Sequence, residues 1–345
     1  MKNTSTRRLP AEWEDQDAVL LAWPHEQTDW AEQLEETQQT FAEIIRAISR
    51  FQRVLLIVPD KAKACSRLEA AAIDLNRVRL YELPCNDTWA RDFGPLTVQT
   101  EQGPLLLDFV FNGWGNKFSA DLDNQLTRCL TAAGAFGETL LSSSELVLEG
   151  GSLESDGAGT LLTTSDCLLE KNRNPLLTRL QIEKELTQHF GAKQILWLEH
   201  GALQGDDTDS HIDTLARFAP DNTLVFQGCN DPAEEHYQEL KAMQKQLAGF
   251  SNLNGESYRL LELPWPQACY DCEGHRLPAT YANFLIINGA VLVPTYKDPT
   301  DQVALEVIAQ AFPHREIIPV DCRVLIEQHG SLHCVTMQLP KGVLP

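Results

Sequence analysis

A unit of about 60 residues recurs along this chain, and that period limits the fold more than any other feature of the sequence. Helix-like stretches begin near residues 61, 121, 176, 234 and 302. Runs rich in Val, Ile and Leu predict strands at residues 54–58, 78–83, 146–148, 195–198, 258–263 and 317–320. A helix and a strand near residues 31–58 come in addition to the repeat. The pattern favours an α/β fold of about five similar units.

Short-range patterns within the units agree with this repeat. Two pairs of apolar segments are typical of hairpins: residues 96–98 with 105–110, and residues 284–287 with 291–293 through Asn288-Gly289. Residues 79–84 (RLYELP) also match residues 259–264 (RLLELP) at five of six positions. We therefore expect these two strands to hold equivalent places in the fold.

A second similarity lies in the turns that follow the strands. Residues 149–153 (EGGSL), 199–203 (EHGAL) and 328–332 (QHGSL) share an acid or amide, a central glycine, a small residue and a leucine, and residues 92–96 (DFGPL) are a weaker copy. Glycine allows a positive φ or a close backbone approach at such turns. If the units surround an axis, the turns meet at one end and their polar residues converge on one pocket.

The composition of the chain limits the kinds of molecule that the protein is expected to bind. The chain has 28 Lys and Arg against 49 Asp and Glu, a formal net charge of -21, which argues against nucleic acid and favours a cationic ligand. No apolar run reaches the roughly 18 residues of a membrane span, and no apolar segment typical of secretion lies near the N-terminus. Nine scattered cysteines indicate reduced thiols in a cytoplasm. We expect a cytoplasmic protein with no membrane partner.

Four segments beside the turns carry unusual polar clusters: residues 86–95 (NDTWARDFGP), 148–151 (LEGG), 205–213 (GDDTDSHID) and 330–334 (GSLHC). A Cys with a His suggests nucleophilic catalysis by a thiol. Carboxylates match the paired N–H donors of a guanidinium, and they raise the pKa of a nearby thiol until a cation arrives. Such a site suits a guanidinium and would repel the oxyanion of an acyl substrate.

These motifs resemble those of the agmatine deiminase family, within the guanidine-modifying pentein superfamily and related to bacterial peptidylarginine deiminases. The resemblance runs from about Trp13 to the C-terminus. It implies a five-bladed α/β propeller with pseudo-fivefold repeats, hence a single pentein catalytic domain over residues 1–345. Length alone, at roughly 150 residues per domain, would suggest two domains, but no low-complexity linker interrupts the chain.

The resemblance also implies a reaction and its catalytic residues. Agmatine and water would give N-carbamoylputrescine and ammonia, a step toward putrescine, through a covalent thiouronium intermediate and with no metal or organic cofactor. Cys334 would attack the guanidinium carbon. His211 would give a proton to the leaving ammonia and then activate water, while Glu149 orients and charges His211.

For the substrate, the resemblance implies that Asp92 and Asp213 grip the guanidinium nitrogens and that Trp89 lines the slot with its flat face. Arg91 would be a structural ion-pair partner. Asp206, Asp207 and Asp209 are either a solvated charge run or groups that hold the distal amine or buttress the loop. We count Asp207 and Asp209 as candidate substrate-binding residues. The resemblance also suggests a homodimer.

Two departures from the family pattern leave the exact substrate open. Agmatine deiminases usually carry Gly-Gly-Gly-Asn-Ile where this chain has residues 328–332 (QHGSL), and Gly commonly stands at the position of Ser210. The alternatives are deiminases of arginine, peptidyl-arginine or another guanidino compound. A repeat-built binding protein without catalysis is a further alternative, which does not account for Cys334, His211 and Glu149 at the turns.

Other readings of single motifs carry less weight. Cys269-x-x-Cys272 with His275 invites a zinc or redox site, but a second ligand pair is missing. His329, His333 and Cys334 could be metal ligands, but in the strand that we expect there they would point to different faces. Glu199 and Gln328 hold the acid or amide position of the repeated turn, and we interpret them as remnants of the repeat without a function of their own. Trp265 lines the pocket or covers an edge; the sequence leaves both open.

Overall fold

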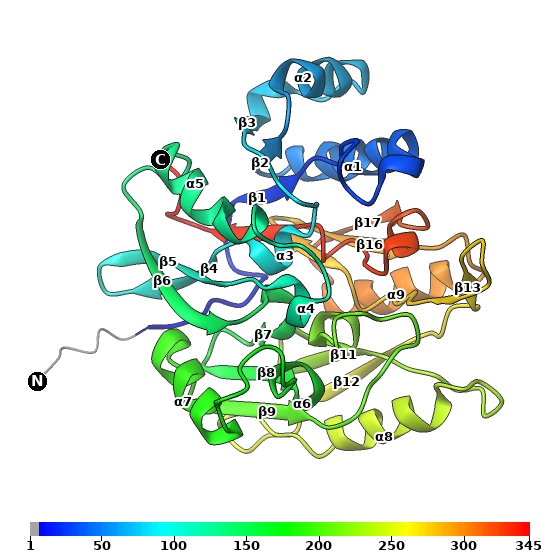
Figure 1. Cartoon of the computed structure of the whole chain (residues 1–345). Coiled ribbons are helices and arrows are strands. Elements are labelled where there is room, and N and C mark those ends of the chain that lie inside the picture. Colours follow the sequence, from blue (N-terminus) through cyan, green and yellow to red (C-terminus); the bar gives the residue numbers. More distant parts are fainter. Residues whose placement is uncertain (1–6) are drawn as a thin grey trace, which may run out of the picture.

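The computed structural model describes residues 7–345 and builds this part of the chain from small mixed sheets, with the longer helices on their outer side (Figure 1). Four sheets of the described chain have three strands each: β4 (Leu96–Thr100), β5 (Gly103–Val110) and β6 (Leu140–Val147); β7 (Glu154–Ser155), β8 (Thr160–Thr164) and β9 (Gln194–Leu198); β10 (Ala216–Ala219), β11 (Thr223–Gln227) and β12 (Arg259–Leu263); β15 (Leu285–Ile287), β16 (Ala290–Thr295) and β17 (Glu316–Asp321).

These four sheets share one connection pattern. The first two strands pair antiparallel, a helix follows, and the third strand then pairs parallel with the second. The connecting helices are α5 (Leu126–Ala132), α7 (Arg179–Phe190), α8 (Tyr237–Leu247) and α9 (Asp301–Ala311). The repeat seen in the sequence is therefore a repeat of this sheet-and-helix unit.

The first sheet joins the two ends of the chain. Its order is β18 (Met337–Pro340), β1 (Gln16–Ala22), β2 (Arg53–Val58) and β3 (Val78–Glu82), with β18 antiparallel to β1 and the others parallel. Helices α1 (Leu34–Ser49) and α2 (Lys61–Ala70) connect the parallel strands. This sheet therefore has one helix and one strand more than the others, as the sequence predicts.

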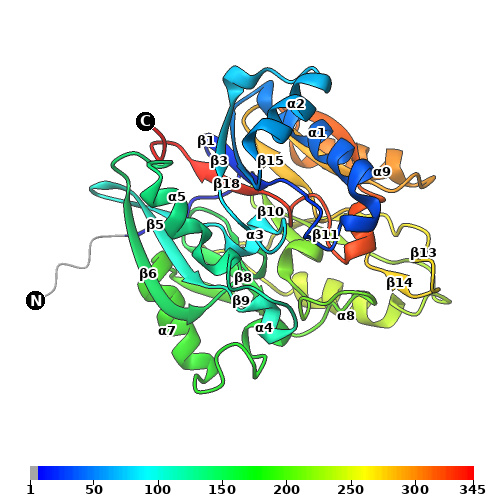
Figure 2. The ribbon, with the colours of Figure 1, turned by 45° about the horizontal axis from the view of Figure 1, so that its top comes forward.

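Shorter elements complete the described chain. A two-stranded ribbon joins β13 (Cys269–Tyr270) to β14 (Arg276–Leu277). The remaining short helices are α3 (Ala90–Phe93), α4 (Gly113–Asn116), α6 (Ser165–Leu168), η1 (Ala31–Gln33), η2 (Leu75–Arg77), η3 (Asp123–Gln125), η4 (Gly150–Ser152), η5 (Ile212–Thr214) and η6 (Leu325–Gln328). Helix α3 lies near the middle of the molecule (Figure 2).

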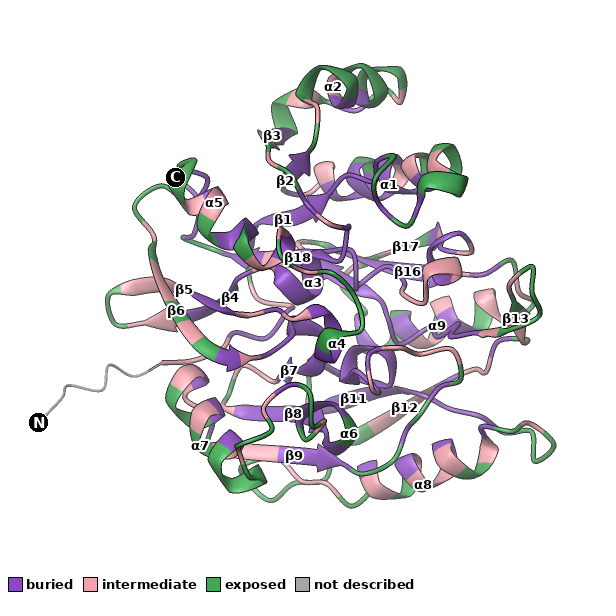
Figure 3. Cartoon of the chain, viewed as in Figure 1, coloured by how far each residue is buried: buried purple, intermediate pink, exposed green. Residues whose placement is uncertain are grey.

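Burial explains why these segments form these elements. Strand β2 reads RVLLIV and is buried after its first residue, as expected for a parallel strand inside a sheet. Helix α1 buries Phe41, Ile44, Ile45 and Ile48, one stripe at helical spacing. Figure 3 shows the same division across the molecule, with buried strands inside and exposed outer faces on the helices.

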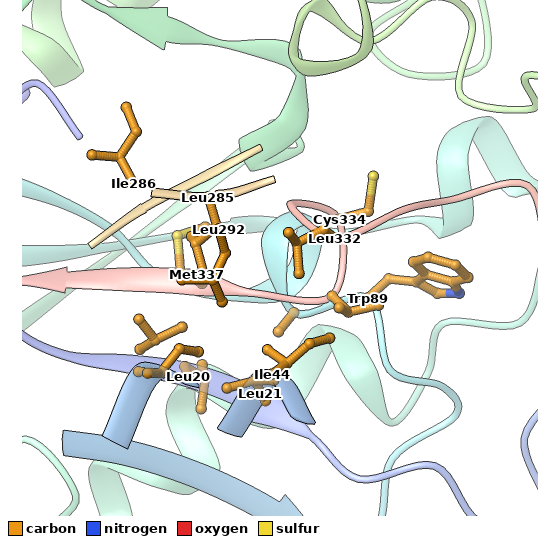
Figure 4. Close-up of a cluster of buried hydrophobic side chains, with 14 of the residues drawn as sticks. Leu20, Leu21, Ile44, Trp89, Leu285, Ile286, Leu292, Leu332, Cys334 and Met337 are labelled. Atoms are coloured by element: carbon orange, nitrogen blue, oxygen red, sulfur yellow. The ribbon is translucent and has the colours of Figure 1, made fainter. Parts of the chain in front are cut away.

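The core continues up to the position of the candidate nucleophile. Apolar side chains of β1, β16 and β18, among them Leu20, Leu292 and Met337, form one hydrophobic cluster. Leu332 and Cys334 belong to the same cluster and lie in the loop that precedes β18 (Figure 4). The packing of β18 therefore fixes the loop that precedes it.

Most sequence predictions of elements are confirmed. Helices α5, α7, α8 and α9 begin at residues 126, 179, 237 and 301, and both expected hairpins form. The two similar strands, β3 and β12, both pair in parallel at the edge of a sheet.

Two predictions of elements were wrong. The strand expected at residues 146–148 is β6 and runs over Leu140–Val147, because its polar residues 142–145 (SSSE) hide it in the sequence. The strand expected around residues 329–334 does not form: His329 has a φ of 65° and turns follow it. No helix of residues 7–345 combines the length and apolar character needed to cross a bilayer.

The N-terminal segment packs under the end of α7. Gly191 caps this helix with a φ of 69°, and a Cβ there would lie 1.9 Å from the carbonyl oxygen of Arg7. The segment is fixed nearby, because the N–H of Leu9 donates to the carbonyl of Phe190 at 3.2 Å.

We expect Gly191→Ala to lower the free energy of unfolding by about 2–5 kcal/mol, since it combines a strained φ with a clash. Gly134→Ala is the matched control: Gly134 has a φ of 75°, but a Cβ there would meet no atom within 4 Å. This control should cost only about 1–2 kcal/mol. Urea unfolding of both variants measures the difference, and equal losses would contradict the close approach.

Candidate active site

The polar turns converge on a pocket of about 660 Å³. Residues singled out from the sequence line it, among them Trp89, Asp92, Asp207, Gln328 and Cys334. The other lining residues are Gln27, Asp29, Asn86, Asp87, Trp114, Lys117, Phe118, Ser119, Asp123, Thr208, His329 and Gly330. Three of the four polar segments thus contribute directly to one cavity, and the fourth lies behind it.

Cys334 is buried at the base of this pocket. Its Sγ lies 3.4 Å from Oδ1 of Asn283 and 3.9 Å from Oδ2 of Asp213. Burial, and then the charges of Asp213 and Asp92, raise the pKa of the Cys334 thiol well above its usual range. The resting sulfur is therefore a thiol that donates to Asn283, a residue that the sequence analysis missed.

Asp92 and Asp213 have pKa shifts in opposite directions. Asp92 accepts hydrogen bonds from the N–H of Gly151 at 2.9 Å and from Nε1 of Trp114 at 3.0 Å. Burial, and then the charge of Asp213, raise the pKa of Asp92. Burial also opposes ionisation of Asp213, but its hydrogen bond with His333 at 2.7 Å and the charge of His333 outweigh it and lower the pKa of Asp213. Neighbouring buried carboxyls commonly divide one proton in this way.

One oxygen of Asp213 has no partner. Its Oδ1 is buried and accepts no hydrogen bond within the described chain, although the residue is ionised. A buried carboxylate oxygen without a donor is costly. The site therefore calls for a ligand that brings N–H or O–H donors.

His211 stands next to this carboxyl pair. Its ring is buried, with Nδ1 3.7 Å from Oδ1 of Asp92, and Nε2 lacks a hydrogen-bond partner among residues 7–345. Burial lowers the pKa of His211 to about 3, so the ring is neutral at rest. A neutral imidazole is able to accept a proton from a nearby thiol.

The glycines of the turns are required by close approaches. A Cβ at Gly151 would lie 2.5 Å from Nδ1 of His211 and 2.9 Å from Oδ1 of Asp92, so a side chain there would displace both groups. A Cβ at Gly330 would lie 2.0 Å from Cζ3 of Trp89. Gly330 thus packs against the ring of Trp89, which turns one wall of the pocket into a flat aromatic surface.

Glu149 lies behind the pocket and contacts a residue that the sequence analysis missed. The guanidinium of Arg173 donates to both carboxylate oxygens of Glu149, at 2.8 and 3.0 Å, and to Asp209 at 2.6 Å. Both side chains of the Arg173–Glu149 pair are fully buried. Burial raises the pKa of Glu149, and Arg173 acts against this shift. Arg173 stands in a polar run, NRN at residues 172–174, which was the available signal.

Asp207 and Asp209 have different positions. Asp207 lines the pocket, and burial raises its pKa to about 6. Asp209 is absent from the pocket lining and pairs with Lys117 at 2.8 Å and with Arg173. Asp209 and Ser210 have φ values of 64° and 63°, so this loop takes the left-handed conformation, which glycine adopts most easily.

Trp114, also missed, belongs to a backbone segment of unusual conformation. Residues 113–116 all have positive φ, including 54° at Trp114 and 64° at Asn116. Such strain persists where the surroundings fix it. Here it holds the indole N–H against Asp92 and the ring edge-on to Trp89, with centroids 6.3 Å apart.

The remaining sequence candidates lie outside the pocket lining. Arg91 is buried, 3.8 Å from Glu12. Glu199 is paired with Arg179 at the surface, and Trp265 lies in a separate small cavity against His236. Cys269 and Cys272 are free thiols, one half-buried and one exposed.

Metal-ligating side chains gather at three places in the described chain. One group is Glu149, Cys167 and His211, another is Glu12, Glu154 and His333, and the third is Glu234, Glu235 and His236. The first two already contain buried guanidinium groups, Arg173 and Arg217, bonded to their carboxylates. These two clusters therefore already hold cationic partners.

Comparison with known proteins identifies the family. Residues 8–340 match the family model described as Porphyromonas-type peptidyl-arginine deiminase. The chain belongs to this deiminase family. Its members include agmatine deiminases: the chain is 34% identical to a Shewanella protein named "Putative agmatine deiminase", over 97% of this chain and 94% of that one.

Solved structures of the deiminase family agree closely in shape. A Porphyromonas gingivalis protein described as "Putative Arginine Deiminase" is 49% identical, with a TM-score of 0.93 over 98% of this chain and 100% of that chain. A Cys-to-Ser variant of agmatine deiminase from C. jejuni, solved with its substrate bound, is 42% identical, with a TM-score of 0.91 over 98% of this chain and 97% of that chain.

A more distant likeness shows the fold alone. Dimethylarginine dimethylaminohydrolase is 13% identical, with a TM-score of 0.51 over 94% of this chain and 100% of that chain. The deiminase described here therefore has a mixed α/β, pentein-like fold. It is a hydrolase of the class that acts on linear amidines, with guanidino compounds as substrates.

Removal of Arg173 tests the buried ion pair behind the site. We expect Arg173→Met to destabilise the deiminase by about 3–5 kcal/mol, because Glu149 then keeps a buried charge without a partner. Arg179→Met is the matched control, since Arg179 pairs with Glu199 at the surface, where such pairs contribute about 0–1 kcal/mol. Thermal and urea unfolding measure both, and a loss below about 1 kcal/mol for Arg173→Met would contradict the assignment.

Proposed function

We propose that this deiminase hydrolyses agmatine to N-carbamoylputrescine and ammonia through a covalent intermediate on Cys334. The observation that carries the proposal is the buried pair Asp92 and Asp213 beside the thiol, with one unpartnered carboxylate oxygen. A guanidinium supplies both the missing donors and the missing positive charge. Its planar shape suits the flat wall made by Trp89.

The first half of the reaction begins with a proton transfer. The cation offsets the negative charges that hold the thiol protonated, so Cys334 loses its proton to the neutral ring of His211. The thiolate sulfur then attacks the guanidinium carbon and forms a C–S bond. The C–N bond breaks, ammonia leaves with the proton from His211, and a thiouronium group remains on Cys334.

The second half restores the enzyme. His211, neutral again, accepts a proton from water as the water oxygen attacks the thiouronium carbon. The C–S bond then breaks, the hydroxyl proton of the adduct passes to the sulfur, and the neutral ureido product leaves. His211 releases its proton to solvent, where ammonia takes it up. Asp92 and Asp213 hold the substrate nitrogens throughout, and Glu149 with Arg173 fixes the loop that carries His211.

The charge of the pocket walls supports agmatine among guanidino compounds. Aspartates at positions 29, 87, 123 and 207 line the same cavity as Asp92. Lys117 is the one Lys or Arg among the lining residues, and its ammonium already bonds Asp209 and the carbonyl of Asp207, at 2.8 and 2.6 Å. A substrate with a second positive charge therefore fits better than one with a free carboxylate. Asp207 is positioned to face that second charge.

A second candidate is deimination of arginine or of peptidyl-arginine. Lys117 and His329 in the pocket wall could donate to a carboxylate or a carbonyl group. The Porphyromonas gingivalis relative, 49% identical, is described as "Putative Arginine Deiminase", and another relative, 47% identical, as "a putative peptidyl-arginine deiminase". These names make the second candidate worth a direct test.

The proposal includes the closed arrangement of the fold. The five sheets would form a single five-bladed α/β propeller domain, with the turns of its blades around the site. The shared connection pattern and the pairing of β18 with β1 support this closure. In such an arrangement residues that lie far apart in sequence reach one pocket.

The substrate is tested by incubating the protein with agmatine, arginine and a blocked arginine peptide. We expect ammonia and a ureido product mainly from agmatine, and a loss of at least about 1,000-fold in rate for Cys334→Ala. Cys85→Ala, at another buried thiol, is the matched control and should retain activity. Turnover of the peptide but not of agmatine would favour the second candidate. A lack of ureido product from all three would leave a binding protein as the remaining reading.

The protonation state of the nucleophile gives a second prediction. Because only thiolates are alkylated and the pKa of Cys334 lies well above its usual value of 9.0, alkylation of Cys334 should still rise about tenfold per pH unit beyond pH 9. Peptide mass spectrometry after short iodoacetamide pulses measures the slope, with exposed Cys272 as the accessible reference. A plateau for Cys334 below pH 9 would contradict the raised pKa.

A further inference from the structure

His333, the residue before the nucleophile, lies between two buried carboxylates. Its Nδ1 is 2.7 Å from Oδ2 of Asp213, and its Nε2 is 2.7 Å from Oε2 of Glu12. The imidazole is 1% exposed and the two carboxylates are almost as deeply buried. Glu12 comes from the segment before β1, more than 300 positions away in the sequence.

The hydrogen-bond geometry defines the charge of this ring. Carboxylate oxygens of ionised Asp and Glu only accept hydrogen bonds, so each ring nitrogen of His333 must donate. Burial opposes ionisation of Glu12, but the charges of His333 and Arg217 hold its pKa below the usual range. The pKa of Asp213 is likewise lowered. His333 is therefore a doubly protonated imidazolium.

Arg217 does not change this conclusion. Its NH2 group lies 3.0 Å from Nε2 of His333 but also 2.9 Å from Oε2 of Glu12. With a proton on Nε2, the guanidinium has no acceptor in the ring and donates to Glu12. Glu12 thus accepts from two cations through one oxygen, and its other oxygen accepts from the backbone N–H of Ile286 at 2.7 Å.

The charged groups around the ring balance one another. Anionic groups face it from the segment before β1 (Glu12), from β7 (Glu154) and from η5 (Asp213), and cationic groups lie on β10 (Arg217) and α3 (Arg91). His211 and Asp92 face Asp213 from the other side, with Cys334 beside them. Removal of one member therefore leaves an uncompensated charge.

The ring also determines which oxygen of Asp213 is available. Oδ2 is committed to His333 and lies 3.9 Å from Sγ of Cys334, whereas Oδ1 has no partner. The backbone of His333 is itself held, because its N–H donates to Oδ1 of Asn283 at 2.8 Å. The carboxylate is therefore fixed in orientation and kept negative before a ligand arrives.

We propose that His333 is a positioning residue for deimination: an imidazolium, held by Glu12, that keeps Asp213 ionised and leaves its Oδ1 free for the guanidinium. The catalytic part of this statement rests on the proposed function, but the charge state of His333 does not. A histidine suits this place because its two nitrogens point to opposite sides and so span two carboxylates with one ring. The sequence analysis considered His333 only as a metal ligand.

The charge state is tested by 15N NMR of the full-length protein labelled at histidine, with the His333 signals assigned by their loss in His333→Gln. We expect both ring nitrogens of His333 to carry protons at neutral pH, because each faces a carboxylate oxygen that can only accept a hydrogen bond. A His333 ring with one bare nitrogen at neutral pH would overturn the proposal. This result does not depend on turnover.

The positioning role is tested by the pH dependence of kcat/KM for Glu12→Gln. The neutral amide no longer offsets the positive charge of the ring beside Arg217, so the ring loses its proton and the pKa of Asp213 rises. Since the active form needs ionised Asp213, the acid limb of the profile should move to higher pH by about 1–2 units. At neutral pH we expect a rise in KM greater than the fall in kcat.

Glu154→Gln is the matched control, because it removes a carboxyl group from the same buried cluster without a hydrogen bond to His333. Its acid limb should move by less than that of Glu12→Gln. An equal shift in both variants, or none in Glu12→Gln, would overturn the positioning role. If Glu12→Gln fails to fold, the NMR measurement on the unsubstituted protein decides. Imidazolium signals in a protein that turns over no guanidino compound would refute the proposed function alone.

Discussion

The arrangement of the site depends on the free-energy cost of burying two carboxyl groups, Asp92 and Asp213, beside a thiol. Burial opposes charge on both, and the charge of Asp213 also opposes charge on Asp92. One of them stays ionised because a buried cation, His333, lies against it, and that cation in turn needs Glu12. The other buried charges, including that of Arg217, offset one another. The result is a site that is short of positive charge by about the amount that a guanidinium brings.

Glycines and loops make this crowding possible. The backbone passes so close to His211 at Gly151, and to Trp89 at Gly330, that a methyl group would not fit at either position. The strained turn at Trp114 delivers a hydrogen-bond donor to Asp92, the member of the carboxyl pair whose pKa is raised. These features appear in the sequence as repeated glycine turns, and their repetition reflects the repeated sheet-and-helix unit.

The sequence was sufficient for the repeat and for some of the residues at the pocket, such as Trp89, Asp92 and Cys334, because these leave local signals. Period and hydrophobicity revealed the helices and most strands, and the motifs contained Cys334, His211, Asp92 and Asp213. What it did not reveal was pairing across the chain. Arg173 bound to Glu149, and Glu12 bound to His333, are contacts between segments whose relation only the fold creates. The predicted range of strand β6 was too short, because its polar residues pair with β5 through the backbone and carry no apolar signal.

The pairing of β18 with β1 has a consequence for the synthesis of this protein on the ribosome. Strand β1 is made well before β18, has an apolar sequence and has one edge that β18 covers. Until residues 337–340 emerge, that edge stays open to other chains. Cys334 precedes this strand by three positions, so the nucleophile takes its place in the same event that closes the edge. A chain released before its final strand would be both inactive and prone to aggregate.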